Sequence, residues 1–169
     1  MLGLIGMEVV FGALALLVLY LRGYSLSSLY PSPSLAGLGK GIGLYIASLI
    51  ASWIAIAPFI ASQPSQPIDA LVSSASVSLS SVVAVALVNG AYEEIFLLGF
   101  LLKGLRGYGL SVALGVSLLV RVLYHLYQGP LGAVSILAFG LVLSLYYVKT
   151  NALFPAVFAH VLADIIPFL

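Results

Sequence analysis

The sequence predicts an all-α membrane protein, a polytopic bundle of about six transmembrane helices, from three observations. Of 169 residues, 63% are hydrophobic and only 7% are charged, whereas about a quarter of the residues of a soluble protein are charged. The mean hydropathy is +1.24. Apolar runs of about 20 residues, the length that crosses a bilayer as a helix, recur between turn-forming residues. We therefore expect one lipid-embedded domain.

Composition also excludes several functions. The net charge is +1 and the six Lys and Arg residues are dispersed, so no basic patch is available to bind nucleic acid. The chain has no cysteine, which excludes a disulfide, a thiolate nucleophile and a cysteine-ligated zinc site. Any catalysis must use oxygen or imidazole groups.

Two apolar helices are expected in residues 1–67. The first runs from about Leu2 to Leu21 and contains Glu8, which we interpret as an edge charge that reaches the interface and has no role in a site. The second runs from about Gly41 to Ala61. The alanines spaced four apart from Ala47 to Ala55 are typical of close helix packing.

A core of four helices is expected in residues 68–169. The stretch from Ile68 to Leu102 has Asp69 at its edge and about 35 residues, or roughly 52 Å of helix, which exceeds a bilayer. We expect Ser73 to Ser81 to lie at the interface or to bend, so that the third span is about Val82 to Leu102. The last three spans are about Leu110 to Tyr127, Leu131 to Val148 and Ala152 to Phe168.

Loop charges predict the orientation. Loops 22–40, 103–109 and 149–151 carry Arg22, Lys40, Lys103, Arg106 and Lys149, and the opposite loops and both termini carry no Lys or Arg. Basic loops favour the cytoplasmic side. These three loops are therefore predicted to be cytoplasmic.

Several polar groups remain inside predicted spans three, four and six. A charged residue at a helix centre costs about 2.5 to 3.5 kcal/mol on insertion scales, so such residues usually face a bundle interior and mark a site. Each of these helices carries a pair spaced four apart, which shares one helix face. The pairs are Asn89 with Glu93, Arg121 with His125, and His160 with Asp164, and Glu94 follows Glu93. Glu93 and Glu94 point about 100° apart, which implies different partners.

The strings that carry these residues resemble three motifs of a known family. They are Tyr92-Glu93-Glu94-Ile95-Phe96-Leu97-Leu98-Gly99, Arg121-Val122-Leu123-Tyr124-His125 and His160-Val161-Leu162-Ala163-Asp164. Their order and separations are similar to those of the CAAX prenyl endopeptidase and bacteriocin-processing (CPBP, or Abi) family of glutamate intramembrane proteases, over about Ile68 to Leu169. The resemblance implies a protease that hydrolyses a peptide bond of a peptide or membrane-anchored protein substrate.

The same resemblance implies roles for the residues. Glu93, with His125, activates a water molecule, while His160 and the residue at position 164 stabilise the oxyanion of the tetrahedral intermediate. The sequence departs from the family at Leu98, where an arginine is usual, and at Asp164, where an asparagine is frequent. Arg121 is then the best candidate partner for Glu94. An ionised Asp164 only accepts hydrogen bonds and would repel an oxyanion, so the residue is expected either to be protonated or to orient His160.

Two alternatives stay open from the residues alone. No cofactor is expected for a water-activating carboxylate, but Glu93, His125 and His160 also form a known zinc ligand set. The second alternative is a catalytically inactive protein, either an immunity or scaffold protein or a proton relay built on the same cluster.

Overall fold

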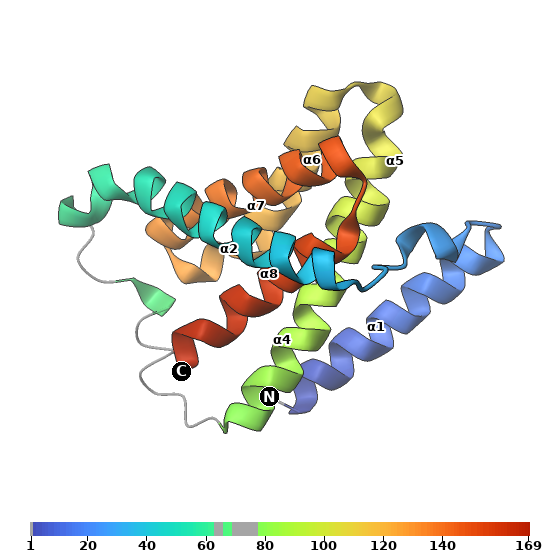
Figure 1. Cartoon of the computed structure of the whole chain (residues 1–169), viewed down its shortest axis with the longest axis horizontal. Helices are drawn as coiled ribbons and strands as arrows, with labels where there is room; N and C mark the ends of the chain where they lie inside the picture. Colours follow the sequence, from blue (N-terminus) through green and yellow to red (C-terminus); the bar gives the residue numbers. More distant parts are fainter. Residues whose placement is uncertain (1, 63–65, 69–77) are drawn as a thin grey trace.

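The computed structural model describes residues 2–62, 66–68 and 78–169, which form helices and no strand. The main elements (Figure 1) are α1 (Leu2–Leu21), α2 (Leu35–Ile56), α4 (Leu79–Glu94), α6 (Leu110–Tyr124), α7 (Pro130–Thr150) and α8 (Leu153–Ile165). Shorter segments are η1 (Leu26–Leu29), η2 (Ala57–Ser62), the π-helix η3 (Ile95–Leu102), α5 (Lys103–Leu105), η4 (Arg106–Tyr108), η5 (Leu126–Gln128) and η6 (Ile166–Phe168). The predicted all-α class is confirmed.

The helices have the length and surface of membrane spans. Within the described residues, Leu35–Ser62, Leu79–Tyr108 and Pro130–Thr150 are long and apolar enough to cross a bilayer, and Ile5–Leu21, Leu110–Tyr124 and Leu153–Phe168 are shorter apolar helices. Large apolar side chains such as Phe11, Trp53 and Leu123 are exposed. Surfaces of this kind suit lipid. The chain is an integral membrane protein built as a helical bundle.

The second helix begins earlier than the predicted Gly41. Ser34 caps its first turn by accepting a hydrogen bond from the Gly37 backbone N–H at 3.0 Å, which satisfies one of the free amides of the helix start. A side-chain β-carbon at Gly37 would lie 2.6 Å from Cδ1 of Phe154, so glycine allows α8 to lie close to this turn. The position at which α2 begins is therefore determined by the Ser34 cap and by packing against Phe154.

The predicted alanine packing face of the second helix is wrong. Ala47 is exposed, and the face that packs is the buried row containing Gly41, Ser48 and Ser52. A β-carbon at Gly41 would lie 2.8 Å from Cδ1 of Phe158. Two rows of small residues run along this helix, and only the contact with α7 and α8 selects one of them.

The third span is not a uniform α-helix within the described residues. Asp69 and residues 73–77 of the predicted bend lie outside the described residues. Ser78 caps α4, and its side chain accepts from the Ser81 backbone N–H at 3.3 Å. The helix then changes from α to π geometry at Ile95, directly after the two glutamates. Single π turns in α-helices are frequent at functional sites.

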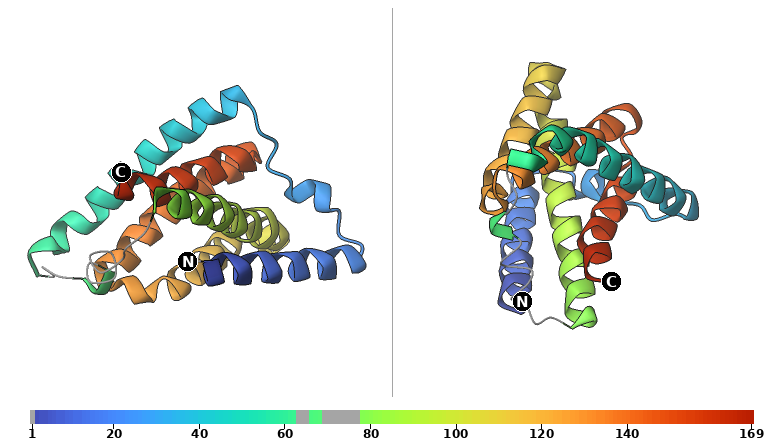
Figure 2. Two further views of the ribbon diagram at one scale, coloured as in Figure 1. Left: turned by 90° about the horizontal axis from the view of Figure 1, so that it is seen from below. Right: turned by 90° about the vertical axis from the view of Figure 1, so that its left-hand side faces the viewer.

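The bundle places α4 and α8 side by side, with the other helices around them (Figures 1 and 2). α2 packs on α7 and α8, α1 packs on α4, and α6 packs on α7 and η3. Both N-terminal helices thus flank the four later helices. Arg106 donates to Oδ1 of Asn151 at 2.9 Å, so the loops before α6 and before α8 meet at one end of the bundle.

Candidate active site

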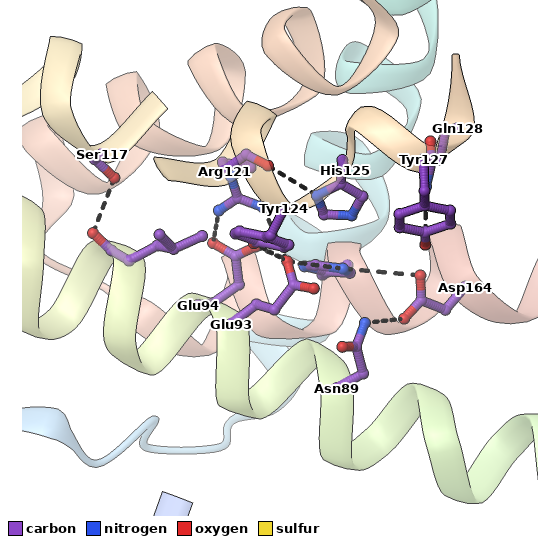
Figure 3. A network of polar contacts seen from close by, with 12 residues as sticks. Asn89, Glu93, Glu94, Ser117, Arg121, Tyr124, His125, Tyr127, Gln128 and Asp164 are labelled. Atoms are coloured by element: carbon purple, nitrogen blue, oxygen red, sulfur yellow. Dashed lines mark hydrogen bonds and ion pairs between the residues drawn. The ribbon is translucent and has the colours of Figure 1, made fainter. Parts of the chain in front are cut away.

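The junction of α4 and η3 holds the two glutamates at the centre of the bundle. Gly90, one turn before them, lets the backbone of α8 approach, because a β-carbon there would lie 3.2 Å from the Val161 nitrogen. In η3, the Leu97 carbonyl accepts a hydrogen bond from Oγ of Ser117 on α6 at 3.0 Å. These contacts bring the polar faces of α4, α6 and α8 together (Figure 3).

Glu94 is bound by two cationic or hydrogen-bonding partners from neighbouring helices. Nη2 of Arg121 donates to its Oε2 at 2.7 Å, and Nδ1 of His160 donates to its Oε1 at 2.6 Å. Glu94 is fully buried and Arg121 is 1% exposed. Both carboxylate oxygens are therefore engaged, and the ring of His160 is held in one orientation.

The predicted pairing of Arg121 with Glu94 is present. Leu98, which stands where the family's arginine is usual, is fully buried in the apolar core instead. The guanidinium fits because Gly140 on α7 has no side chain, since a β-carbon there would lie 2.6 Å from Cδ of Arg121. The positive charge near Glu94 thus comes from α6 rather than from the same helix.

Glu93 faces a different set of groups. Its Oε2 accepts a short hydrogen bond from the hydroxyl of Tyr124. The same oxygen lies 3.8 Å from Nη1 of Arg121 and 3.9 Å from Nε2 of His160. These two separations exceed hydrogen-bond length and are within the reach of a bridging water molecule.

Asp164 completes the arrangement from α8. Its Oδ2 accepts from Nδ2 of Asn89 at 3.0 Å, and its Oδ1 lies 3.7 Å from Nε2 of His160. The Asn89 amide therefore holds Asp164 as an acceptor on the open side of the His160 ring. This geometry suits an orienting role, which is one of the two that the sequence leaves open.

His125 lies at the end of α6, where the helix stops. Its Nδ1 donates to the Arg121 carbonyl at 2.9 Å, and its ring lies 4.4 Å from that of Tyr124. With Nδ1 protonated, the neutral imidazole carries its lone pair on Nε2 and is a hydrogen-bond acceptor there. The helix end thus places a hydrogen-bond acceptor next to Tyr124, which is itself bonded to Glu93.

Two cavities meet at these residues. The larger, of about 570 Å³, is walled by Asn89, Glu93, Tyr124, His125, Gln128 and Asp164 together with apolar side chains. The smaller, of about 330 Å³, shares His125, Gln128 and Asp164 and adds His160 and Ser52. The polar network therefore lies between two cavities that border it on different sides of α8.

The structure brings together all seven residues that the sequence singles out, and it adds two. Tyr124 was not predicted, although it lies one turn after Arg121 in the same motif. Glu8, which the sequence leads us to interpret as an edge charge without a site, lines the larger cavity with Glu93 and Asp164. No sequence spacing relates α1 to the other helices, so only the fold reveals that contact.

The alternative zinc set consists of Glu93, His125 and His160. Among the described residues, no group of three His, Asp or Glu side chains is placed to hold one metal ion. Nδ1 of His160 is engaged with Glu94.

Comparison with known proteins agrees with these observations. Residues 75–166, more than half of the chain, match the family described as type II CAAX prenyl endopeptidase Rce1-like. No curated protein matches the chain, and no solved structure does. The matched range contains α4 to α8 and every predicted site residue. The chain therefore belongs to the Rce1-like family of type II CAAX prenyl endopeptidases.

Proposed function

We propose that the protein is an intramembrane endopeptidase in which Glu93 activates a water molecule for attack on a peptide bond. The observation that carries this proposal is that Oε2 of Glu93, which lines the cavity of about 570 Å³, is 3.9 Å from Nε2 of His160, which lines the cavity of about 330 Å³. A water molecule beside this pair can contact both the carboxylate and the imidazole. Membership of an endopeptidase family supports the same reaction class.

The first step is the attack of water on the carbonyl carbon of the substrate. The Glu93 carboxylate takes a proton from water while the water oxygen bonds to that carbon, and the carbonyl oxygen becomes an oxyanion. General base catalysis by a positioned carboxylate contributes about 10² to 10⁴ in rate. The hydroxyl of Tyr124, bonded to the same oxygen of Glu93, holds the carboxylate in place.

The oxyanion is stabilised by His160. Because Glu94 accepts the hydrogen bond of Nδ1 and is also paired with Arg121, it fixes the orientation of the ring. When the ring is protonated, Nε2 also carries an N–H, and a hydrogen bond from this N–H to the oxyanion stabilises the intermediate. Asp164, held by Asn89, positions the same N–H from the other side.

The second step is the cleavage of the carbon–nitrogen bond. The proton taken by Glu93 passes to the departing amine, directly or through His125, whose Nε2 is an acceptor in the same cavity wall. The products are a carboxylic acid and an amine, which become a carboxylate and an ammonium group when the acid gives its proton to the amine, and Glu93 is again ionised. No metal ion or organic cofactor takes part in this mechanism.

The substrate class is a peptide or membrane-anchored protein segment. The larger cavity combines polar groups with apolar residues such as Val82 and Phe168, and it lies within a bundle whose outer faces suit lipid. A segment that is held at the membrane can therefore place one peptide bond beside Glu93.

Cleavage of a fluorogenic amphiphilic peptide library by the purified chain in lipid nanodiscs tests the function. Glu93→Gln should lower kcat/KM by at least about 10²-fold, and His160→Ala by about 10²- to 10³-fold. Lys103→Gln, at an exposed position, is the control and should keep the wild-type rate. Equal residual cleavage by wild type, Glu93→Gln and His125→Ala refutes the proposal and indicates a scaffold.

The orientation is part of the same proposal, with loops 22–40, 103–109 and 149–151 on the cytoplasmic side. The Arg106 to Asn151 hydrogen bond supports a common side for the last two loops. Lys40 and Asn151 line one polar cavity, which joins the first loop to them. Since the chain has no cysteine, single cysteines at Lys40, Lys103 and Lys149 can be labelled with an impermeant maleimide in sealed vesicles. All three should react from the cytoplasmic face only.

A further inference from the structure

Glu8 reaches the candidate active site from a helix outside the range that matches the family. α1 packs along α4 (Figures 1 and 2), and a β-carbon at Gly12 would lie 3.2 Å from the ring of Tyr92. Gly12 stands one turn after Glu8, so this close approach determines where Glu8 lies. Its side chain lines the same cavity as Glu93, His125 and Asp164.

The carboxyl group of Glu8 has hydrogen-bonding capacity that the described part of the chain does not use. Its Oε2 is shielded from solvent and has no hydrogen-bond partner among the described residues. The other two acids of the cavity differ, because Glu93 accepts from Tyr124 and Asp164 accepts from Asn89. A shielded carboxylate without a partner is costly in a medium of low dielectric constant.

The surroundings of Glu8 suit a positive charge. Among the described residues that line the cavity there are three acids and no Lys or Arg, and His125 is the sole basic group. The rings of Tyr92 and Tyr127 also form part of the wall, and aromatic faces attract ammonium and guanidinium groups. A bound cation would offset the cost of the shielded carboxylate, whereas a neutral group of the same size would not.

We propose that Glu8 binds the cationic side chain of a Lys or Arg residue of the peptide substrate, next to the bond that is cleaved. This inference rests on the proposed endopeptidase function and adds a substrate preference to it. Glu8 is here a specificity-determining residue, and the chemistry remains with Glu93 and His160. The preference is for a basic residue because a basic side chain supplies a hydrogen-bond donor and also a positive charge that compensates the carboxylate.

Two measurements test the proposal on the full chain in lipid nanodiscs. The first is the Kd of N-lauroyl-lysine methylamide and of its norleucine analogue, which differ in the charged group. Wild type should bind the lysine compound at least about tenfold more tightly. Glu8→Gln should bind both equally, and Glu8→Asp should retain the preference. Met7→Gln, on the exposed side of the same turn, places an amide at the same depth and should also retain it.

The second measurement is kcat/KM for two cleavable peptides that differ by Lys or norleucine beside the scissile bond. The lysine peptide should be favoured by wild type and by the Met7→Gln control, and Glu8→Gln should lose this ratio. Equal Kd values in wild type, or a preference that survives Glu8→Gln, overturns the inference. Absent cleavage with an intact binding preference refutes the endopeptidase function and leaves the cation subsite standing.

Discussion

Replacing Arg121 by methionine removes the cation from the buried pair with Glu94 while keeping an unbranched side chain of similar length. Arg121 is 1% exposed and its Nη2 lies 2.7 Å from Oε2 of Glu94, which is fully buried. After the substitution, the Glu94 carboxylate keeps one partner, Nδ1 of His160 at 2.6 Å. The stability of this variant therefore measures how much the guanidinium of Arg121 contributes to the buried pair.

The expected loss follows from the burial of the pair. Removing one partner of a buried ion pair costs about 3 to 5 kcal/mol, because the remaining charge is left without compensation. Since His160 still compensates part of the charge, we expect the free energy of unfolding to fall by about 3 kcal/mol, at the lower end of that range. Glu94→Gln leaves Arg121 with Glu93 alone, at 3.8 Å, and should cost a similar amount.

Reversible unfolding in mixed micelles of rising SDS fraction, followed by circular dichroism, measures these changes. In the double variant Glu94→Gln with Arg121→Met, the loss should be smaller than the sum of the single losses by about 2 kcal/mol, since neither charge remains unpaired. A loss below about 1 kcal/mol for Arg121→Met, the value of an exposed pair, would refute the reasoning. So would strict additivity in the double variant.

Three further predictions address the chemistry and the packing. Tyr124→Phe removes the hydroxyl that donates to Glu93 but keeps the ring beside His125, so kcat for peptide cleavage should fall by about tenfold with KM unchanged. An unchanged kcat would contradict the proposal that the hydroxyl positions the Glu93 carboxylate. Gly140→Ala places a β-carbon 2.6 Å from Cδ of Arg121 and should lower the free energy of unfolding in mixed micelles by about 1 to 3 kcal/mol. The control is Gly39→Ala, which should not lower the free energy of unfolding because a β-carbon there meets no atom within 4 Å. Dialysis against EDTA should leave cleavage unchanged, because the proposed mechanism activates water through Glu93 without a metal ion. Loss of activity that zinc restores would instead favour the alternative ligand set.

Much of the site was predictable from spacing within single helices. The pairs Asn89 with Glu93, Arg121 with His125, and His160 with Asp164 each share a helix face, because residues four apart lie one turn apart. The partner of Glu94 was also predictable by elimination, since Arg121 is the one base inside a predicted span. Charges buried in a membrane bundle need partners, and few were available.

Other features depend on contacts between helices that no spacing encodes. The small residues of α2 form two rows, and the row with Gly41, Ser48 and Ser52 is buried only because α7 and α8 lie against it. Glu8 lines the cavity because α1 lies along α4. Neither arrangement follows from the order of residues within one helix.

By itself, the sequence determined the membrane class, the approximate spans and the three polar helix faces, since a bilayer imposes a length and a polarity on every segment that crosses it. The tertiary structure decided which carboxylate meets which partner, so that Glu94 is enclosed by Arg121 and His160 while Glu93 faces a cavity. The physical reason is that helical periodicity fixes directions around one axis, whereas the rotation, tilt and depth of a helix are set by packing against its neighbours.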